Sequence, residues 1–387
     1  MGRLVLTSKG FAWFRKGHPW TFRDDLEKAQ DAAPGAIVSL EKKNGDFLAQ
    51  GFYSDRSKIA FRLVSRERRA VDREFWKARL QRAAQLRQVV VRKTSAYRLV
   101  YGESDGIPSL IVDRYGDHLV MQILSQGADQ LTPLFAELLS ELFQPASLVL
   151  RNDLSVRALE GLHQEKKILL GSLPGSIDVC EGGIRYAVDP WSGHKTGSYL
   201  DQRENRVRAG GYFREKVLDA FCYQGLFGLH AARSAARVTC VDSSQEALDQ
   251  AEENARLNAF KNLDFHRENI FDFLKEEMER KNQYNGINLD PPAFAKSRGD
   301  VAAASRGYKE LNLRALRLLK PGGILITSSC SYNLSESKFL EILKDSAQDA
   351  KAEARIIEKR GQSADHPILL SFPESSYLKC IILEKIS

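Results

Sequence analysis

From about residue 179 onward, short apolar strands alternate regularly with amphipathic helices, and this alternation restricts the fold more than any other feature of the chain. Parallel strands need a long crossover connection, which is usually a helix that packs back on the sheet. We therefore predict an α/β domain over residues 179–387, with a doubly wound, mainly parallel sheet. The expected strands are KVLDAF, RVTCVD, LDFHREN, GINLD and GGILITSSC, and the expected helices are GLHAARSA, SQEALDQAEENARLN, FDFLKEEMERK and a long helix to Leu319.

Two smaller domains are expected before this sheet. Residues 1–73 contain the expected strands AIVSLEKK, DFLAQGFY and SKIAFRLV, and the Asn44-Gly45 pair after the first of them is typical of a hairpin. Residues 74–178 begin with a helix of apolar residues at helical spacing. A hairpin in LIVDRYGDHLVMQIL and an amphipathic helix in DQLTPLFAELLSELF follow. The sequence thus predicts a β-rich domain, a linker helix with a small α+β central domain, and the α/β domain.

Positive charge is concentrated in the first quarter of the chain. The 387 residues carry 57 Lys plus Arg and 50 Asp plus Glu, but residues 1–93 hold 21 of the basic residues and only 10 of the acidic ones. Aromatic residues such as Trp13 and Trp20 are interleaved with them. Basic and aromatic side chains together favour a nucleic acid as partner, because they neutralise phosphates and stack on bases. The alternative is a solvated basic face that binds nothing.

The sequence also argues against several classes of protein. Its apolar runs are far shorter than the roughly 20 residues of a membrane span, and its start has no apolar stretch of signal-peptide length. Its five cysteines are widely spaced and form no CxxC pair, which disfavours a disulfide framework or a structural zinc site. We expect a cytoplasmic protein with no membrane association and no metal.

Residues that follow the first two strands of the sheet predict a nucleoside-like ligand. The turn after the first strand, residues 219–228, contains Gly225 and Gly228, which let a backbone approach a ligand, but it lacks the GxGxxG pattern of dinucleotide sites. Asp242 ends the second strand, where a carboxylate can accept both hydroxyls of a ribose. The alternative is that Asp242 or the serines after it cap the next helix.

Polar residues also end the third and fourth strands. Asn269 and Ile270 follow the third strand, where they could meet an adenine, although Asn is also common in turns. The fourth strand ends in Asp290-Pro291-Pro292-Ala293-Phe294. Two prolines fix the chain and remove two donors, which leaves a carboxylate and nearby carbonyls to face a planar substrate.

These motifs, in this order, resemble the class I S-adenosyl-L-methionine-dependent methyltransferases. More narrowly, KTGSYLDQREN, FCYQGLFG, VDSSQEAL, DPPAF, SSCS, ADHP and YLKC are similar to the bacterial large-subunit (23S) ribosomal RNA cytosine-5 methyltransferase family. GESDGIPSLIVDRYGD resembles its central domain, and residues 1–73 resemble its PUA module, an RNA-binding fold. The resemblance covers almost the whole chain. It departs where Ser198 replaces the usual Phe-Gly and where Asn269 replaces a frequent Asp.

The resemblance implies a Rossmann-like methyltransferase domain with S-adenosyl-L-methionine as its cofactor. The residues that it places at this cofactor are Gln202, Asp219, Phe221, Tyr223, Gly225, Asp242, Ser243, Asn269, Ile270, Asp290 and Pro292. Those that it places at the substrate are Lys195, Arg203 and Phe294.

Carbon 5 of cytosine is too weak a nucleophile to take a methyl group directly, so the implied reaction needs a thiolate that adds to carbon 6. Cys330 stands between two serines at the end of the fifth strand, which we expect to lie beside the Asp-Pro-Pro segment, and it is the expected nucleophile. The alternative role for Cys330 is that of a small apolar residue buried in the core. Asp290 would bind the cytosine amino group and ring nitrogen 3. Related enzymes can carry a second Cys after the proline pair, where this chain has Ala293.

A base inside a helical stack hides carbon 6, so the expected substrate is single-stranded or partly unfolded ribosomal RNA, docked by the PUA-like domain. The family resemblance also implies a homodimer. Three other functions remain open. Methylation of another base atom, such as guanine nitrogen 7, would not need Cys330. A non-catalytic RNA-binding assembly factor would bind no cofactor, and an NAD-dependent dehydrogenase lacks its GxGxxG turn.

Overall fold

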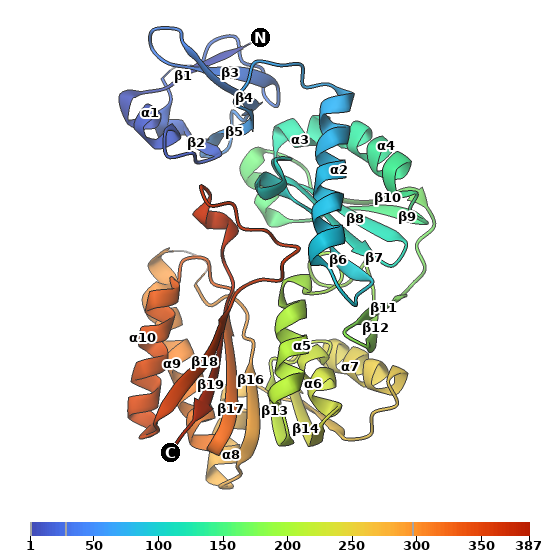
Figure 1. Ribbon diagram of the computed structural model, residues 1–387, viewed down its shortest axis with the longest axis vertical. Helices are drawn as coiled ribbons and strands as arrows, with labels where there is room; N and C mark the ends of the chain where they lie inside the picture. Colours follow the sequence, from blue (N-terminus) through green and yellow to red (C-terminus); the bar gives the residue numbers. More distant parts are fainter. Residues whose placement is uncertain (1, 28, 296–297) are drawn as a thin grey trace. The chain divides into compact units, whose positions relative to one another are not determined.

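The computed structural model describes residues 2–27, 29–295 and 298–387 (Figure 1). Contacts divide the chain into two compact units. The first unit comprises Met1–Val179, Val188–Leu200 and Ala364–Ser375, and the second comprises Cys180–Ala187, Asp201–Ser363 and Ser376–Ser387.

The first unit begins with a five-stranded sheet of order β1-β3-β4-β5-β2. The hairpin expected at the Asn-Gly pair is confirmed, because β3 and β4 are antiparallel neighbours and Gly45 has a φ of 89°. The short helix α1, capped by Thr7, was not predicted. The elements are β1 (Arg3–Val5), α1 (Ser8–Phe14), β2 (Trp20–Phe22), β3 (Ile37–Glu41), β4 (Phe47–Tyr53) and β5 (Ile59–Ser65).

A long helix and a second five-stranded sheet, of order β10-β9-β8-β7-β6, complete the first unit. The expected linker helix is α2, whose N-cap Asp72 accepts a hydrogen bond from the Phe75 amide. The single helix expected near residue 130 is divided at Leu131, because Pro133 has no amide hydrogen and starts a new helix. The elements are α2 (Arg73–Val90), β6 (Ala96–Tyr101), β7 (Leu110–Tyr115), β8 (His118–Ile123), α3 (Gln126–Gln130), α4 (Thr132–Phe143), β9 (Ser147–Asn152) and β10 (Glu165–Gly171).

The second unit is built on a seven-stranded sheet of order β15-β14-β13-β16-β17-β19-β18. All neighbouring pairs from β15 to β17 are parallel, whereas β19 is antiparallel to both β17 and β18. The predicted doubly wound, mainly parallel sheet is confirmed; β18 and β19 were not predicted. The strands are β13 (Glu215–Ala220), β14 (Ala235–Asp242), β15 (Leu263–Arg267), β16 (Tyr284–Leu289), β17 (Leu319–Ser329), β18 (Ala354–Arg360) and β19 (Lys379–Lys385).

Helices bury both faces of this sheet (Figure 1). Successive residues of one strand point to opposite faces, so Leu218 packs with α8, α9 and α10, whereas Val217 packs with α5, α6 and α7. Burial on both faces explains why these strands are almost continuously apolar in sequence. The helices are α5 (Arg203–Tyr212), α6 (Leu226–Ala232), α7 (Gln245–Leu257), α8 (Ile270–Glu279), α9 (Val301–Leu318) and α10 (Glu336–Ala350).

The remaining elements are short. A two-stranded sheet pairs β11 with β12, and Gly182 and Gly183 between them both have positive φ, as a tight hairpin turn requires. The pair is β11 (Ile177–Glu181) and β12 (Ile184–Val188), and the 3₁₀ helices are η1 (Arg23–Asp25), η2 (Gly102–Asp105), η3 (Ser155–Glu160), η4 (Leu200–Gln202), η5 (Arg298–Asp300) and η6 (Pro373–Ser375).

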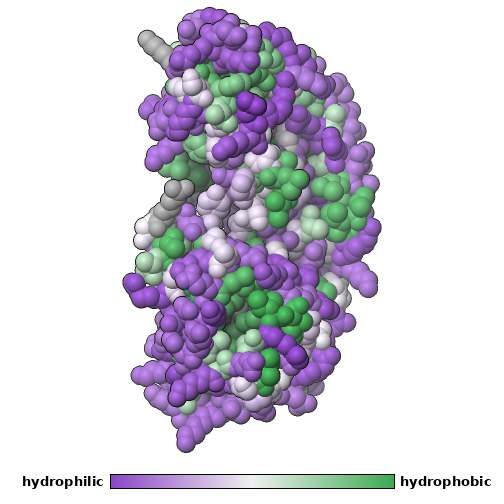
Figure 2. Space-filling model, turned by 60° about the vertical axis from the view of Figure 1, so that its left-hand side comes forward, coloured by the Kyte–Doolittle hydropathy of each residue, from purple (hydrophilic) through white to green (hydrophobic). Residues whose placement is uncertain are grey.

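Hydrophilic residues cover most of the face in Figure 2, with separate apolar patches between them. Among the described residues, no helix combines the length and the apolar character needed to cross a membrane.

A buried ion cluster fastens α5 and α6 to the β11-β12 turn. The Glu181 carboxylate accepts hydrogen bonds from Arg206 Nε, at 2.7 Å, and from Arg206 Nη2, and its Oε1 lies 3.1 Å from His230 Nε2. All three side chains are at most 3% exposed. Burial opposes ionisation of Glu181, but the charge of Arg206 outweighs it and lowers the Glu181 pKa to about 2.

Replacing this carboxylate should destabilise the second unit. We expect Glu181→Gln to reduce the free energy of unfolding by about 3 kcal/mol at pH 7, because it leaves Arg206 buried without its counter-charge. A carboxyl whose pKa is lowered by folding stabilises the fold above its ordinary pKa of 4.5 and loses that effect as the pH falls toward 2. The difference between wild type and variant in denaturant unfolding should therefore shrink over that range. The control Glu253→Gln, in an exposed pair with Arg256, should change stability by less than about 0.5 kcal/mol.

Candidate active site at the carboxyl ends of the parallel strands

Most of the predicted site residues of the second unit lie where β13, β14, β16 and β17 end. Ala220, the last residue of β13, pairs with Leu289 of β16, which pairs with Thr327 of β17. The Asp290 amide donates to the Ala220 carbonyl at 3.4 Å. The chain order reverses between β13 and β16, which is where ligands bind in open parallel sheets. The loops that carry Gly225, Asp290 and Cys330 therefore start from neighbouring strand ends.

The turn after β13 holds a strained backbone. Phe221 and Tyr223 have φ values of 62° and 48°, and Gly225 has 74°. Left-handed residues with a side chain cost about 1–3 kcal/mol each and persist only where surrounding bonds hold them. Here the Cys222 amide donates to the Val241 carbonyl at 3.1 Å, and the Gly225 amide donates to the Cys222 carbonyl at 2.8 Å. The turn is thus pre-formed, with Phe221 and Tyr223 half-buried.

Asp219 is buried and forms hydrogen bonds with residues around this turn. Its side chain is 1% exposed, and its two oxygens accept hydrogen bonds from the Gly228 amide at 2.7 Å and from Asn288 Nδ2 at 2.8 Å. Burial raises the Asp219 pKa to about 7, against the effect of these donors. Asp219 therefore positions the turn, and its contact with the cofactor stays a prediction.

Asp242 braces the same turn from β14. Its Oδ2 accepts the Tyr223 amide at 2.9 Å, and its Oδ1 accepts the Ser244 amide at 3.0 Å. The helix cap that the sequence left open belongs to Ser244, whose Oγ accepts the Ala247 amide at 3.2 Å. Asp242 is half-buried, and each of its oxygens keeps a second lone pair for a ligand hydroxyl. Ser243 beside it is exposed.

The residues after β15 have structural partners. Asn269 Oδ1 accepts the Phe271 amide at 2.9 Å and caps α8, so the turn role that the sequence left open is observed, on an exposed residue. Ile270 is 3% exposed and belongs to the core beside Phe273. Its predicted cofactor contact is therefore limited to its backbone.

A chain of side-chain amides orients Asp290. Gln202 Nε2 donates to Asp290 Oδ1 at 2.8 Å, and Gln202 Oε1 accepts from Asn205 Nδ2 at 2.7 Å. Asn205 Oδ1 in turn accepts from Arg360 Nε at 2.9 Å. Gln202, which was predicted at the cofactor, is 3% exposed and acts on Asp290. Asn205 lies in the segment that the sequence singled out but received no role there, and no sequence signal marked Arg360.

Cys330 follows β17 in a closely bonded frame. The Tyr308 hydroxyl lies 2.9 Å from Ser329 Oγ and 3.1 Å from Ser331 Oγ, which fixes both neighbours of the cysteine. The Cys330 Sγ lies 4.0 Å from the Pro291 carbonyl, on the loop that carries Asp290. The predicted nucleophile thus lies against the loop that carries the predicted acid.

Cys330 differs from the buried cysteines. Cys222, Cys240 and Cys380 are buried, and burial raises the pKa of the Cys380 thiol to about 12 and that of Cys222 well above its ordinary value. Cys330 and Cys180 are only partly buried. Cys330 is therefore not the fully buried core residue that its alternative role would require.

The predicted substrate-binding residues differ in how far they are exposed to solvent. The Phe294 ring is half-buried against Tyr308, with ring centroids 4.9 Å apart, while Pro292 is exposed. Arg203 is 2% exposed, and its Nη2 lies 3.2 Å from Glu204 Oε1, so a direct substrate contact by Arg203 is not favoured. Lys195 belongs to the first unit, is exposed, and holds its ammonium 4.3 Å from the centre of the Tyr199 ring.

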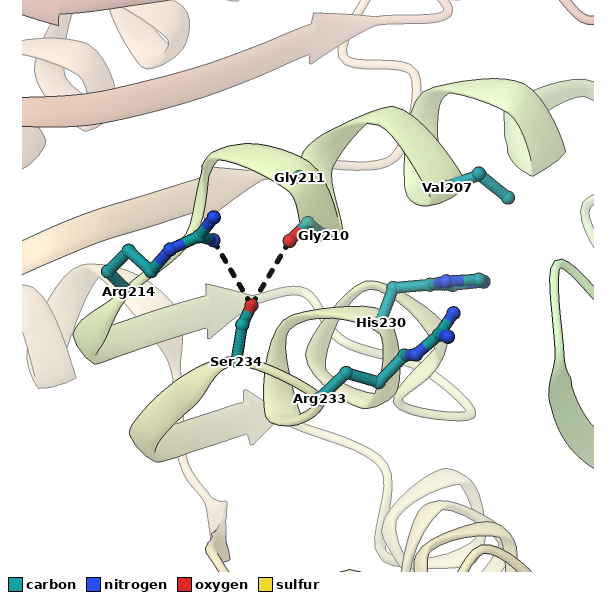
Figure 3. Close-up of a pocket in the computed structure, with 7 residues that line it drawn as sticks. All are labelled: Val207, Gly210, Gly211, Arg214, His230, Arg233 and Ser234. Carbon is teal, nitrogen blue, oxygen red and sulfur yellow. Dashed lines mark hydrogen bonds between the residues drawn. The ribbon is translucent and has the colours of Figure 1, made fainter.

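The pocket in Figure 3 is separate from these residues. It has a volume of about 340 Å³ and lies between the last turns of α5 and α6. Ser234 Oγ joins its walls by accepting from Arg214 Nη1 and donating to the Gly210 carbonyl, both at 3.2 Å. None of the predicted site residues lines it. Over residues 2–27, 29–295 and 298–387, no group of three or more His, Cys, Asp or Glu side chains is arranged to hold a metal ion.

Comparison with known proteins connects this geometry to a family. A PUA-like domain model matches residues 4–66, and a methyltransferase domain model matches residues 214–370. The ribosomal RNA large subunit methyltransferase I of Aeromonas hydrophila is 41% identical over 376 residues, which cover 95% of each chain. That of Tolumonas auensis is 40% identical, over 95% of this chain and 96% of its own.

The chain belongs to the ribosomal RNA large subunit methyltransferase I family. Its fold is also that of a crystal structure titled a putative methyltransferase complexed with SAH, with a TM-score of 0.86, 21% identity, and coverage of 99% of this chain and 100% of the other. The predicted class I methyltransferase fold, the PUA-like domain and the large-subunit ribosomal RNA family are thereby confirmed. The dehydrogenase alternative is wrong.

The left-handed position of Gly225 gives a test of the turn. A Cβ there would lie 2.9 Å from the Ala251 Cβ, whereas Gly322, with a similar φ of 77°, has open space. Both Gly→Ala variants should lose about 1–2 kcal/mol of stability from backbone strain. Only Gly225→Ala should also weaken binding of the predicted cofactor, S-adenosyl-L-methionine, by about tenfold or more in titration calorimetry, since about 1.4 kcal/mol of distortion corresponds to that factor. Equal affinities of the two variants would contradict a role for this turn in cofactor binding.

Proposed function

We propose that this protein methylates carbon 5 of a specific cytosine in 23S ribosomal RNA, with S-adenosyl-L-methionine as methyl donor and Cys330 as covalent nucleophile. The observation that carries the proposal is the position of Cys330. The residue is only partly buried, its Sγ lies 4.0 Å from the Pro291 carbonyl, and it follows β17, which neighbours β16, the strand before Asp290. Methylation of guanine nitrogen 7 would leave this arrangement without a use.

The turn after β13 fits the cofactor. It is held open by left-handed residues and by Gly225, where a larger side chain would strike Ala251. Tyr223 and Asp242 flank it, and Asp242 keeps lone pairs for the ribose hydroxyls. The bound cofactor supplies an electrophilic methyl group on a sulfonium. Ser243, Asn269, the Ile270 backbone, Asp290 and Pro292 complete the proposed surroundings of this group.

In the proposed reaction the Cys330 thiolate forms a bond to carbon 6, and the electron pair of the 5,6 double bond moves toward carbon 5 and ring nitrogen 3. Asp290, held by Gln202, stabilises the charge that develops at nitrogen 3 by donating a proton, and its other oxygen accepts from the amino group. Carbon 5 then takes the methyl group as the carbon–sulfur bond of the sulfonium breaks and leaves a neutral thioether, and nitrogen 3 returns its proton to Asp290 as the ring regains its neutral form. Loss of the carbon 5 proton to a base restores the double bond and expels the thiolate.

The first unit would supply RNA affinity. Its PUA-like domain and the excess of basic residues over residues 1–93 suit a phosphate backbone, and Lys195 and Phe294 are the proposed substrate contacts. We propose a single-stranded or partly unfolded region of the RNA as target, because a stacked base hides carbon 6. We also propose a cytoplasmic homodimer with domains over residues 1–73, 74–178 and 179–387.

Trapping the covalent intermediate tests the nucleophile. With ribosomal RNA that contains 5-fluorocytosine, fluorine replaces the proton that must leave, so a protein–RNA adduct through Cys330 should accumulate in the presence of S-adenosyl-L-methionine. Denaturing electrophoresis and mass mapping would detect it. Cys330→Ala should form no adduct and lose methylation by at least about 10³-fold. Cys180→Ala, which changes the other partly buried cysteine, should retain both. Full methylation by Cys330→Ala would decide for a non-covalent reaction at another atom.

Removing the acid should slow the chemical step. We expect Asp290→Asn to lower kcat by about 10²-fold or more, because an amide has no proton to give to nitrogen 3 as the thiolate adds. The variant keeps the oxygen that accepts from Gln202, so its thermal unfolding midpoint should stay near that of the wild type. Unchanged kcat for single-turnover methylation would rule out this role for Asp290.

A further inference from the structure

A buried lysine lies next to the end of the strand that carries Cys330. Lys379 is the first residue of β19, and the register pairs it with Ser329, the residue before Cys330. It is 7% exposed. The sequence marked Lys379 only as part of the segment YLKC and gave it no task.

The ammonium of Lys379 is held by two carbonyls. Its Nζ donates to the Ser331 carbonyl at 2.7 Å and to the Tyr377 carbonyl at 2.8 Å. An ammonium has three donors, so these bonds leave one more. Among the described residues, no carboxylate lies within ion-pair distance of Lys379. Glu336, which acts on it from farther away, is already paired with Lys359 at 3.0 Å.

A buried cation without a paired carboxylate is costly, and such groups are candidates for a functional role. Burial lowers the Lys379 pKa to about 8, and the nearby charges that oppose this effect are those of Cys330 and Glu336. Glu336 is exposed and already paired with Lys359. Of the two charges that act on Lys379, that of Cys330 is the one in the candidate active site.

We propose that Lys379 is a positioning residue that fixes the backbone after Cys330 and stabilises the Cys330 thiolate with its ammonium. The inference deepens the proposed function and rests on it for the role of Cys330 as nucleophile. A cation close to a cysteine favours the thiolate, which is the reactive form.

The other groups around Cys330 do not supply this charge. The Tyr308 hydroxyl, from α9, is bonded to the two serines that flank the cysteine, and burial raises its pKa, so it stays neutral. Asp290, on the loop after β16, would oppose a thiolate when ionised. Of these groups, Lys379 carries a positive charge that interacts with Cys330.

The test measures the ionisation of Cys330 without RNA. The rate of Cys330 alkylation by iodoacetamide, followed by peptide mass mapping, is determined from pH 5 to 10 in the full chain. In the wild type the midpoint should lie below the ordinary thiol value of about 8.5. In Lys379→Met it should rise by about one unit, which slows alkylation about tenfold at a pH below both midpoints. Lys379→Arg, which keeps the charge, should stay close to the wild type.

Lys385→Met is the matched control. Lys385 is the last residue of β19, and its ammonium also donates to two carbonyls, those of Leu316 and Leu319, at 2.9 and 2.8 Å. This variant should also lose two hydrogen bonds to carbonyls and leave the Cys330 profile unchanged. An unchanged profile in Lys379→Met, or an equal shift in both variants, would overturn the proposal.

A wild-type midpoint at or above about 8.5 would also overturn it, and this readout needs no variant to fold. Failure of the proposed function would instead show as methylation by Cys330→Ala, so the two failures are distinguishable.

Discussion

The parallel hydrogen-bond ladder through β13, β16 and β17 is the constraint on which the rest of the site depends. It brings the ends of three strands, whose following loops carry Gly225, Asp290 and Cys330, to one edge of the sheet, although Gly225 and Cys330 are separated by more than a hundred residues. Burial of both sheet faces by α5 to α10 makes this edge rigid. Loops that start from such strand ends have little freedom, and a nucleophile can be held beside an acid.

Around this edge, most of the polar side chains discussed form hydrogen bonds with the backbone or with other side chains. Asp219 and Asp242 fix a strained turn, and Gln202 orients Asp290. Tyr308 fixes the serines on both sides of Cys330. A group that acts on a reacting atom is most effective when its orientation is already fixed, because no free energy is then spent on reorganising it in the transition state. The arrangement separates residues that meet the substrate from those that keep them in place.

The fold was largely predictable because its signals are local. Strand–helix alternation after residue 179 predicted the doubly wound sheet, and the Asn-Gly pair predicted the hairpin between β3 and β4. The failures are also local in cause. Pro133 divides a predicted helix, and β18 and β19 were not predicted because these two antiparallel strands are joined without an α-helix between them, which breaks the alternation. The side chains of Asp219 and Ile270, both predicted at the cofactor, are buried, and strand-end position alone does not reveal burial.

The sequence by itself determined the order of the elements, the motifs after each strand and, through them, the family and the candidate nucleophile, because each of these is written in contiguous residues. Tertiary structure alone decided which polar groups meet. The chain Arg360–Asn205–Gln202–Asp290 and the approach of Lys379 to the end of β17 join segments far apart in sequence. Their contacts depend on strand order and antiparallel register, and no local pattern encodes either of them.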